Sequence, residues 1–302
     1  MACLATIRWE TSQQDLQHGH TVVTLVLGAT GFIGSAVIRQ FAARDYRRVI
    51  GFVRTKRDAQ ELAAAGVAAW IGDVSDVDSL RRVMAQVETV ISCVSYVGHD
   101  EQRCIDVNQR GTQNIATISA EAGVDRLLYV STAAVYGPGP FRDLPVDGVP
   151  IRPRSPASRT RAAAEVYVRD AGGLVIRPHL VYGPGDKWFW PGLRNMTDRM
   201  GFMIDDGSAL HSTIHVDHLA KIIADLSEKG PVDHGRTMHV NESRPSHVIE
   251  ILKQIGRATG WDFPRHSITR ESALLRAEEL GIDTKMINLI SRDHWFRSLD
   301  DV

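Results

Sequence analysis

Residues suited to holding a phosphate stand together in the segment GATGFIG, residues 28–34. Gly28 permits a tight turn, Gly31 lets the backbone approach a pyrophosphate, and Gly34 lets a helix and a strand pack closely. The segment follows a strand-like run and precedes a helix-like run, whose first N–H groups and positive dipole end attract anions. It therefore predicts a dinucleotide-binding loop. Its cofactor-binding candidates are Gly28, Thr30, Gly31, Phe32, Ile33 and Gly34.

The residues after the second strand-like run predict which dinucleotide binds. An acidic residue at that point would accept hydrogen bonds from an adenosine ribose. Here Arg54 is followed by Lys56 and Arg57, and the first carboxylate is Asp58. A 2′-phosphate would be attracted by this cluster, so we expect NADP(H) to be preferred, with NAD(H) as the second candidate cofactor. A solvated basic turn is the alternative interpretation.

Strand-like and helix-like segments alternate along the first 183 residues, and this order positions the loop. Short apolar, β-branched runs predict buried strands, and apolar residues at helical spacing predict the helices between them. This alternation is typical of right-handed βαβ units that build a parallel sheet. The expected strands are 21–29, 47–54, 67–73, 89–95, 124–132 and 173–183, and the expected helices are 32–44, 57–66, 76–86, one within 102–122, and one opening at 155–165.

The sequence changes character after Gly183, where prolines and the aromatic segment KWFWPG interrupt the alternation. We expect an α/β fold: a Rossmann-type, doubly wound parallel sheet with a smaller C-terminal substrate lobe that closes over the carboxyl ends of the strands. The predicted boundaries are a loose tail over 1–20, a core over 21–183 and a lobe over 184–302. Helices are expected at 247–260 and 271–281, and residues 212–225 are expected to return to the core.

Composition excludes several classes of function. The 302 residues carry a formal net charge of −1, which gives no electrostatic signature for nucleic acid or an anionic membrane. The sequence contains no run of about 18 apolar residues that would span a bilayer. The three cysteines Cys3, Cys93 and Cys104 are too few for a disulfide framework. We therefore expect a cytoplasmic protein that acts on a small molecule.

In these motifs the chain resembles extended or atypical short-chain dehydrogenases/reductases, a group that includes nucleotide-sugar epimerases and 3β-hydroxysteroid dehydrogenases. The resemblance implies that Asp73 lies near the adenine and that Val74 beside it also binds the cofactor. It further implies that Asn108 supports the helix beside the active site, and that Pro178 and Leu180 flank the nicotinamide. The matching motifs, within about 22–240, are GATGFIG, GD at 72–73, NQRGTQNI from 108, LLYVSTAAVYG ending at 137, RPHLVYGPGD from 177 and IHVDHLA from 214.

The family's acid–base pair is a tyrosine followed four residues later by a lysine, and a nearby serine or threonine orients the substrate oxygen. Thr132 fits the hydroxyl position. In SPASRTRAAAE, residues 155–165, the tyrosine and lysine positions fall on Ala157 and Arg161. Alanine cannot exchange a proton. Arginine keeps the positive charge and could hold a ribose hydroxyl, but it is a poor acid. Arg161 is thus a candidate for cofactor binding and for catalysis.

Three other side chains are candidate proton donors. Tyr96 and His99 follow the fourth strand, in a loop that edges the nicotinamide pocket in the family, and Tyr136 follows Thr132 by four residues. A histidine titrates in the range suited to acid–base work near neutrality. Water could also serve if Thr132 held the substrate's oxyanion.

The second half of the chain bears on the substrate. Nucleotide-sugar members usually place an arginine where this sequence has His211, and a neutral histidine is a weaker ligand for a diphosphate. The aromatic residues 188–190 suggest an apolar pocket wall, with anchoring of the lobe as the alternative. The histidines and the aspartate of HSTIHVDH, residues 211–218, are not expected to bind a metal, because the segment runs from a strand into a helix.

Three functions remain open. The first is an NADP-dependent oxidoreductase with an unconventional acid, acting on a small lipophilic or aromatic carbonyl, imine or conjugated alkene. The second is a non-catalytic NADP-binding protein whose partner contacts respond to the redox state of the cofactor. The third is a nucleotide-sugar epimerase or dehydratase, which the missing tyrosine and arginine disfavour. The resemblance also implies a homodimer formed through a two-fold helix pair.

Overall fold

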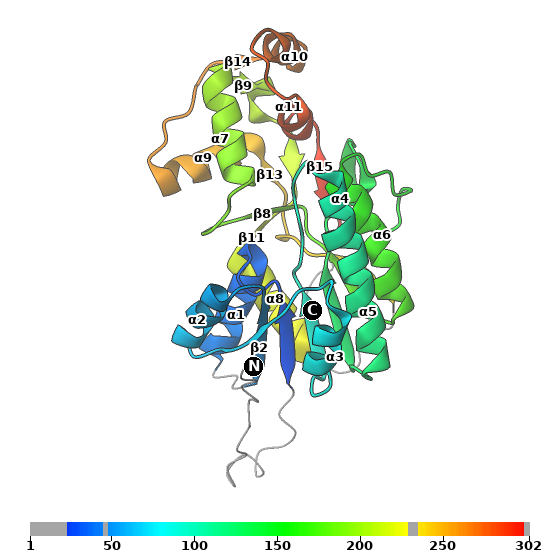
Figure 1. The fold of residues 1–302 in the computed structure, drawn as a ribbon. Coiled ribbons are helices and arrows are strands. Elements are labelled where there is room, and N and C mark those ends of the chain that lie inside the picture. Colours follow the sequence, from blue (N-terminus) through cyan, green and yellow to red (C-terminus); the bar gives the residue numbers. More distant parts are fainter. Residues whose placement is uncertain (1–22, 45–47, 229–234, 299–302) are drawn as a thin grey trace.

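The computed structural model describes residues 23–44, 48–228 and 235–298, so the tail expected over 1–20 lies outside the described residues. At its centre is a seven-stranded sheet with the order β12-β7-β5-β4-β1-β2-β3, in which every neighbouring pair is parallel (Figure 1). This confirms the Rossmann-type α/β fold. The strands are β1 (Thr24–Leu27), β2 (Val49–Val53), β3 (Ala68–Ile71), β4 (Thr89–Ser92), β5 (Arg126–Val130), β7 (Leu174–Arg177) and β12 (Thr237–His239).

Helices cover both faces of this sheet because most of its strands are apolar on both faces, and β1 and β2 are buried along their whole length. One face packs against α1 (Phe32–Ala43), α2 (Lys56–Ala64) and α8 (Val216–Glu228). The other face packs against α3 (Val77–Met84), α5 (Gly111–Glu121) and α6 (Pro156–Asp170). A short helix, α4 (Glu101–Cys104), leads through a π-helical segment at Ile105–Arg110 into α5.

The segment predicted as one strand over 173–183 forms two. Strand β7 ends at Arg177, and β8 (Leu180–Tyr182) leaves the central sheet to pair with β11 (Thr213–His215). The break falls at Pro178, which has no N–H to continue a sheet ladder. The prediction of a single strand was therefore wrong, and this break is the point where the chain passes from the sheet into the lobe.

The lobe has its own apolar core between four helices, built from residues such as Leu193, Ile251 and Ile287. Its helices are α7 (Phe189–Met200), α9 (Val248–Thr259), α10 (Arg270–Glu279) and α11 (Lys285–Ile290). Its base is a four-stranded sheet of β13 (Ser246–His247), β10 (Leu210–His211), β15 (His294–Phe296) and β6 (Phe141–Leu144), and β9 (Met203–Ile204) pairs with β14 (Ser267–Ile268). In the described part of the chain, no helix combines the length and the apolar character needed to cross a bilayer.

Candidate active site

The glycine loop lies between the carboxyl end of β1 and the first turn of α1. Gly28 has φ +77°, a conformation that favours glycine, and a Cβ on Gly34 would lie 2.1 Å from the Gly28 carbonyl oxygen. Gly31 is the N-cap of α1, and among the described residues no side chain caps the N–H groups of the first turn. Those N–H donors, with the tight backbone beside them, fit a dinucleotide pyrophosphate.

Arg54 and Asp73 meet at the ends of β2 and β3. Arg54 is exposed, and its charge reaches the Asp73 carboxylate. Burial works to raise the pKa of Asp73, but hydrogen bonds from the N–H and Oγ of Ser75, at 2.9 and 2.7 Å, together with Arg54, hold that pKa below its usual value. Val74 is buried beside them, and its carbonyl accepts a hydrogen bond from Asn114. Arg54 at the end of β2 and Asp73 at the end of β3 thus lie next to each other, beside the same expected cofactor site.

Thr132 follows the carboxyl end of β5 and is partly buried. Its Oγ1 accepts a hydrogen bond from the N–H of Ala134 at 3.2 Å, so its own hydroxyl proton remains available for donation. The N–H of Ala133 donates to the carbonyl of Pro178 at 2.9 Å. This hydrogen bond holds the backbone next to Thr132 against the carboxyl end of β7. The structure therefore brings Thr132 and Pro178 together, while Leu180, the next predicted contact, is buried in the core of the lobe.

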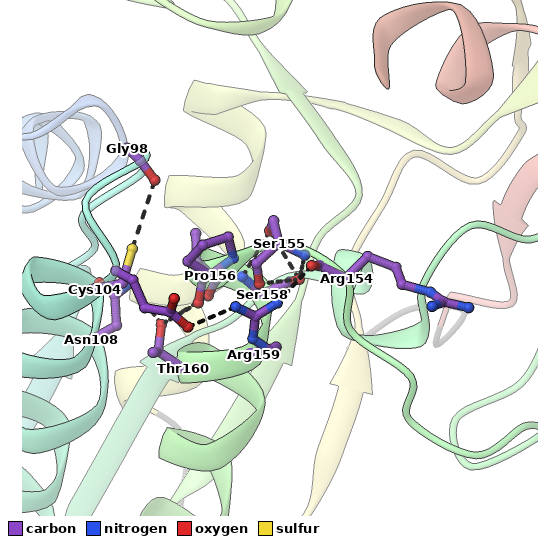
Figure 2. A network of polar contacts seen from close by, with 11 residues as sticks. Gly98, Cys104, Asn108, Arg154, Ser155, Pro156, Ser158, Arg159 and Thr160 are labelled. Atoms are coloured by element: carbon purple, nitrogen blue, oxygen red, sulfur yellow. Dashed lines mark hydrogen bonds and ion pairs between the residues drawn. The ribbon is translucent and has the colours of Figure 1, made fainter. Parts of the chain in front are cut away.

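Helix α6 carries Ala157 in its first turn, and that turn is held rigidly. The Ser155 Oγ accepts the N–H of Ser158 and the Ser158 Oγ accepts the N–H of Ser155, both at 3.0 Å, a reciprocal capping box. Asn108 donates from Nδ2 to the Thr160 Oγ1 at 3.1 Å and so ties the helix to the π-helical segment (Figure 2). The backbone that would present a tyrosine at position 157 is thus intact, although the side chain is only a methyl group.

Arg161 lies one turn further along α6 and points toward the sheet. Its Nη2 donates to the carbonyl oxygen of Val130 at 3.0 Å, at the carboxyl end of β5. Its Nε is buried and has no hydrogen-bond partner among the described residues. The guanidinium charge therefore lies at the end of the strand that leads to Thr132.

The loop after β4 carries Tyr96 and His99. The side chain of Asn108 holds this loop by accepting the N–H of Tyr96 at 2.6 Å and donating to its carbonyl at 3.0 Å. The Tyr96 ring folds back over Gly98, and the Arg103 guanidinium lies 4.6 Å from its centre. His99 is exposed and faces Asp283 of the lobe, whose pKa is lowered mainly by the N–H of Lys285 and slightly by His99. Of these two candidates, only His99 presents an exposed titratable group.

Tyr136 points away from this edge into the protein. It is 2% exposed, and its Oη accepts from the Arg177 Nη1 at 2.7 Å and lies 2.8 Å from the His239 Nε2. Burial raises the pKa of Tyr136, and the Arg177 charge only partly opposes this. Arg177 in turn forms a buried ion pair with Glu165 of α6. Tyr136 is therefore the least favourable of the three candidate acids.

A cluster of histidines lies between the central sheet and the lobe. The sequence did not predict that these side chains contact one another. The rings of His179, His211 and His294 are nearly parallel, with centroids 5.6 to 5.8 Å apart, and the His179 Nε2 lies 3.3 Å from the His211 Nδ1. His211 has no exposed surface, and burial lowers its pKa to about 3. A buried, neutral His211 cannot serve as a ligand for a diphosphate.

The three aromatic residues 188–190 have separate environments. Phe189 is buried in the core of the lobe, Trp190 stacks on Tyr182 at 5.4 Å, and the Trp188 side chain is 62% exposed. Their loop passes the glycine loop, since a Cβ on Gly185 would lie 3.5 Å from the Phe32 ring. Phe189 anchors the lobe, and Trp188 remains available to a ligand. Within the described ranges, no group of three or more histidine, cysteine, aspartate or glutamate side chains has a geometry that could hold a metal.

Known proteins resemble the chain in sequence and in fold. It is 29% identical over 254 residues to a 2-alkyl-3-oxoalkanoate reductase of Stenotrophomonas maltophilia (strain K279a), covering 78% of this chain and 75% of the relative. It is 29% identical over 223 residues to a 4-hydroxy-2-methyl-3-oxo-4-farnesyl-3,4-dihydroquinoline-1-oxide ketoreductase of Stigmatella aurantiaca, covering 69% and 65%. The solved structure of the Bordetella bronchiseptica enzyme WbmH in complex with NAD+ shares the fold, with a TM-score of 0.70, 18% identity and coverage of 91% and 97%.

A family model gives the assignment. The model of the NAD dependent epimerase/dehydratase family matches residues 24–240, which run from the first strand of the central sheet to its last. The same range contains the glycine loop, Thr132 and Arg161. The chain therefore belongs to the NAD dependent epimerase/dehydratase family and is an NAD(P)-dependent oxidoreductase of the extended short-chain dehydrogenase/reductase type.

Proposed function

We propose that the chain is an NADP-dependent reductase of a small, lipophilic or aromatic oxo compound, and that it works without the family's tyrosine. The observation that carries the cofactor preference is the end of β2, where exposed Arg54 stands and no carboxylate follows before Asp58. The reductase activity is supported by the names of the two relatives described above, both of which include a 3-oxo compound. Buried, neutral His211 argues against a nucleotide-sugar substrate.

The cofactor preference gives a direct test on Arg54. Arg54→Ala is expected to weaken NADPH binding at least about tenfold and to leave NADH binding unchanged, because only the 2′-phosphate loses a charge-assisted partner. Fluorescence titration of the purified protein with both dinucleotides measures this. Arg81→Ala is the matched control, since Arg81 is an exposed arginine of α3 that pairs with Glu121 at 3.2 Å and lies outside the basic cluster. Equal losses for NADPH and NADH, or none for either, would contradict the assignment of Arg54.

The roles of the protein's own groups follow from their geometry. The dinucleotide, when bound, supplies the hydride. Thr132 uses its free hydroxyl proton to hold the substrate oxygen, since its lone pair is already engaged by the N–H of Ala134. The Arg161 guanidinium, fixed at the end of β5, stabilises the negative charge that develops on that oxygen. His99, on the exposed loop that faces the lobe, or a water molecule delivers the proton.

The missing tyrosine gives the second test. In the variant Ala157→Tyr/Arg161→Lys, the two new side chains lie four residues apart on one face of the capped helix α6. We expect kcat/KM for NADPH-dependent ketone reduction to rise at least about tenfold, because a positioned acid contributes ~10²–10⁴ in rate. Steady-state assays on a ketone panel between pH 6 and 9 measure the rate and its pH profile.

The control for this variant is Ala157→Phe/Arg161→Lys, which adds the same bulk without a hydroxyl. It is expected to show no gain in rate. If kcat/KM rose equally in both variants, the shape of the new side chains, and not the tyrosine hydroxyl, would be responsible for the gain. If neither variant reduced any ketone while both still bound NADPH, the reductase proposal would fail and the cofactor assignment would stand.

A further inference from the structure

A groove of about 400 Å³ opens in the lobe, where three parallel strands of its basal sheet begin. Arg142 contributes from the start of β6, Ser208 from the residues before β10, and Ser291, Arg292 and Asp293 from the segment between α11 and β15. These strands are adjacent, in the order β10-β15-β6, so residues far apart in the sequence meet at one edge. None of these residues belongs to the dinucleotide site.

The groove is rich in hydrogen-bond donors that have no protein partner. Arg292 is partly buried, and among the described residues its guanidinium forms no ion pair or hydrogen bond. The Ser291 Oγ is buried and also lacks a partner within the described ranges. Arg142 uses only its Nε, which donates to the Asp293 Oδ2 at 2.6 Å, and its side chain is 74% exposed. The guanidinium N–H groups that Arg142 and Arg292 leave unused are therefore free to donate to a ligand in the groove.

The charges of the groove identify the chemistry of that ligand. Asp293 is committed on both oxygens, since its Oδ1 accepts the N–H of Leu210 at 2.9 Å while its Oδ2 faces Arg142. Together with Arg142 and Arg292, it leaves the groove with a net charge of +1. A planar guanidinium recognises carboxylate and phosphate groups through two parallel N–H bonds.

We propose that this groove is a binding site for a small anion that carries a carboxylate or phosphate group, held by the Arg292 guanidinium and by the guanidinium N–H groups that Arg142 leaves unused. The site goes beyond the proposed reductase activity and does not depend on it, because its residues belong to the lobe sheet and to the segments that lead into its strands. The bound anion is a separate small molecule or the anionic group of a larger one.

Isothermal titration calorimetry of the full chain with inorganic phosphate and with succinate tests the site. Each titration is repeated with saturating NADP+, so that the dinucleotide site cannot take up the added anion. Arg292→Ala is expected to weaken binding of the preferred anion at least about tenfold, and Arg292→Lys by less, since an ammonium keeps the charge but loses the paired geometry. Arg142→Ala is expected to weaken binding a few-fold, because it removes the second guanidinium of the groove.

The matched control is Arg276→Ala, because Arg276 is an exposed arginine of the same lobe that pairs with Glu279. It is expected to bind both anions as the native chain does. Tighter binding of phosphate than succinate would assign a phosphate-bearing ligand, and the reverse order a carboxylate. The proposal is overturned if neither anion binds the native chain, or if Arg292→Ala binds as tightly as the native chain. NADPH titration of Arg292→Ala is expected to be unchanged, so a failure here is distinguishable from a failure of the reductase proposal.

Discussion

Glu165→Ala is expected to lower the free energy of unfolding by about 3–5 kcal/mol, because it leaves a buried arginine without its partner. Arg177 is 1% exposed and Glu165 is fully buried. Arg177 donates from Nε and Nη2 to the two carboxylate oxygens of Glu165, at 2.9 and 2.5 Å, and from Nη1 to Tyr136. This pair fastens α6 to β7, so its loss also loosens the helix that carries Ala157 and Arg161.

Urea unfolding followed by circular dichroism measures the effect. Glu228→Ala is the control, since Glu228 forms a 3.0 Å pair with Arg44 that is partly exposed, and it is expected to cost less than about 1 kcal/mol. The double variant Glu165→Leu/Arg177→Met removes both charges and is expected to be more stable than Glu165→Ala. If Glu165→Ala unfolded at the same urea concentration as the native chain, the structural role of this ion pair would be refuted.

Acidification from pH 7 to 5 is expected to remove a large part of the stability, through the histidines between the sheet and the lobe. Burial lowers the pKa of His179 well below 6.5, that of His211 to about 3, that of His239 to about 4, and that of His294 as well. The unfolded chain therefore binds protons at these imidazoles below pH 6.5 while the folded chain does not. Their contribution is present above pH 6.5 and is lost as the pH falls.

The size of the effect follows from proton linkage. An imidazole with an unfolded pKa near 6.5 that stays neutral in the fold contributes about 2 kcal/mol between pH 7 and 5, so His179, His211 and His239 together contribute up to ~6 kcal/mol. That sum is comparable with the whole stability of a typical domain, ~5–15 kcal/mol. The neighbouring Asp293 carboxylate favours protonation of His211, and burial outweighs it.

Urea unfolding at half-unit pH steps measures the number of protons taken up on unfolding. His211→Leu is expected to reduce that number by about one below pH 6. His266→Gln is the control and is expected to leave it unchanged, because His266 is exposed. Equal unfolding midpoints at pH 7 and pH 5 in the native chain would rule out the proposed linkage.

The sequence was sufficient to predict those parts of the fold that are determined by the pattern of residues close together in the chain. Apolar, β-branched runs gave the strands around the glycine loop, because a strand buried on both faces needs them. Gly28 and Gly34 were identifiable because no other residue fits their backbone. The break at Pro178 could also have been predicted locally, because proline has no N–H to donate. The apolar residues on both sides of it nevertheless indicated a single strand.

The contacts that depend on tertiary pairing left no such signal. His211 and His294 are 83 positions apart, and they meet because β10 pairs with β15 in the lobe sheet, where the two histidines are register partners. Nothing in the spacing of Glu165 and Arg177 indicated an ion pair. Tyr136 was a reasonable candidate acid from its distance to Thr132, but the short helix at Ala133–Tyr136 turns its hydroxyl inward to Arg177.

The position of β12 at the edge of the central sheet has a consequence for biosynthesis. Strand β7 pairs with β12 along Val175–Arg177, and β12 follows β7 in the chain only after α7 and α8. While a ribosome is still producing the stretch between these two strands, β7 is therefore the open edge of an otherwise complete sheet, able to pair with a strand of another nascent chain. Slow translation between residues 183 and 237 would lengthen that exposure, so the yield of folded protein depends on how quickly this stretch is synthesised.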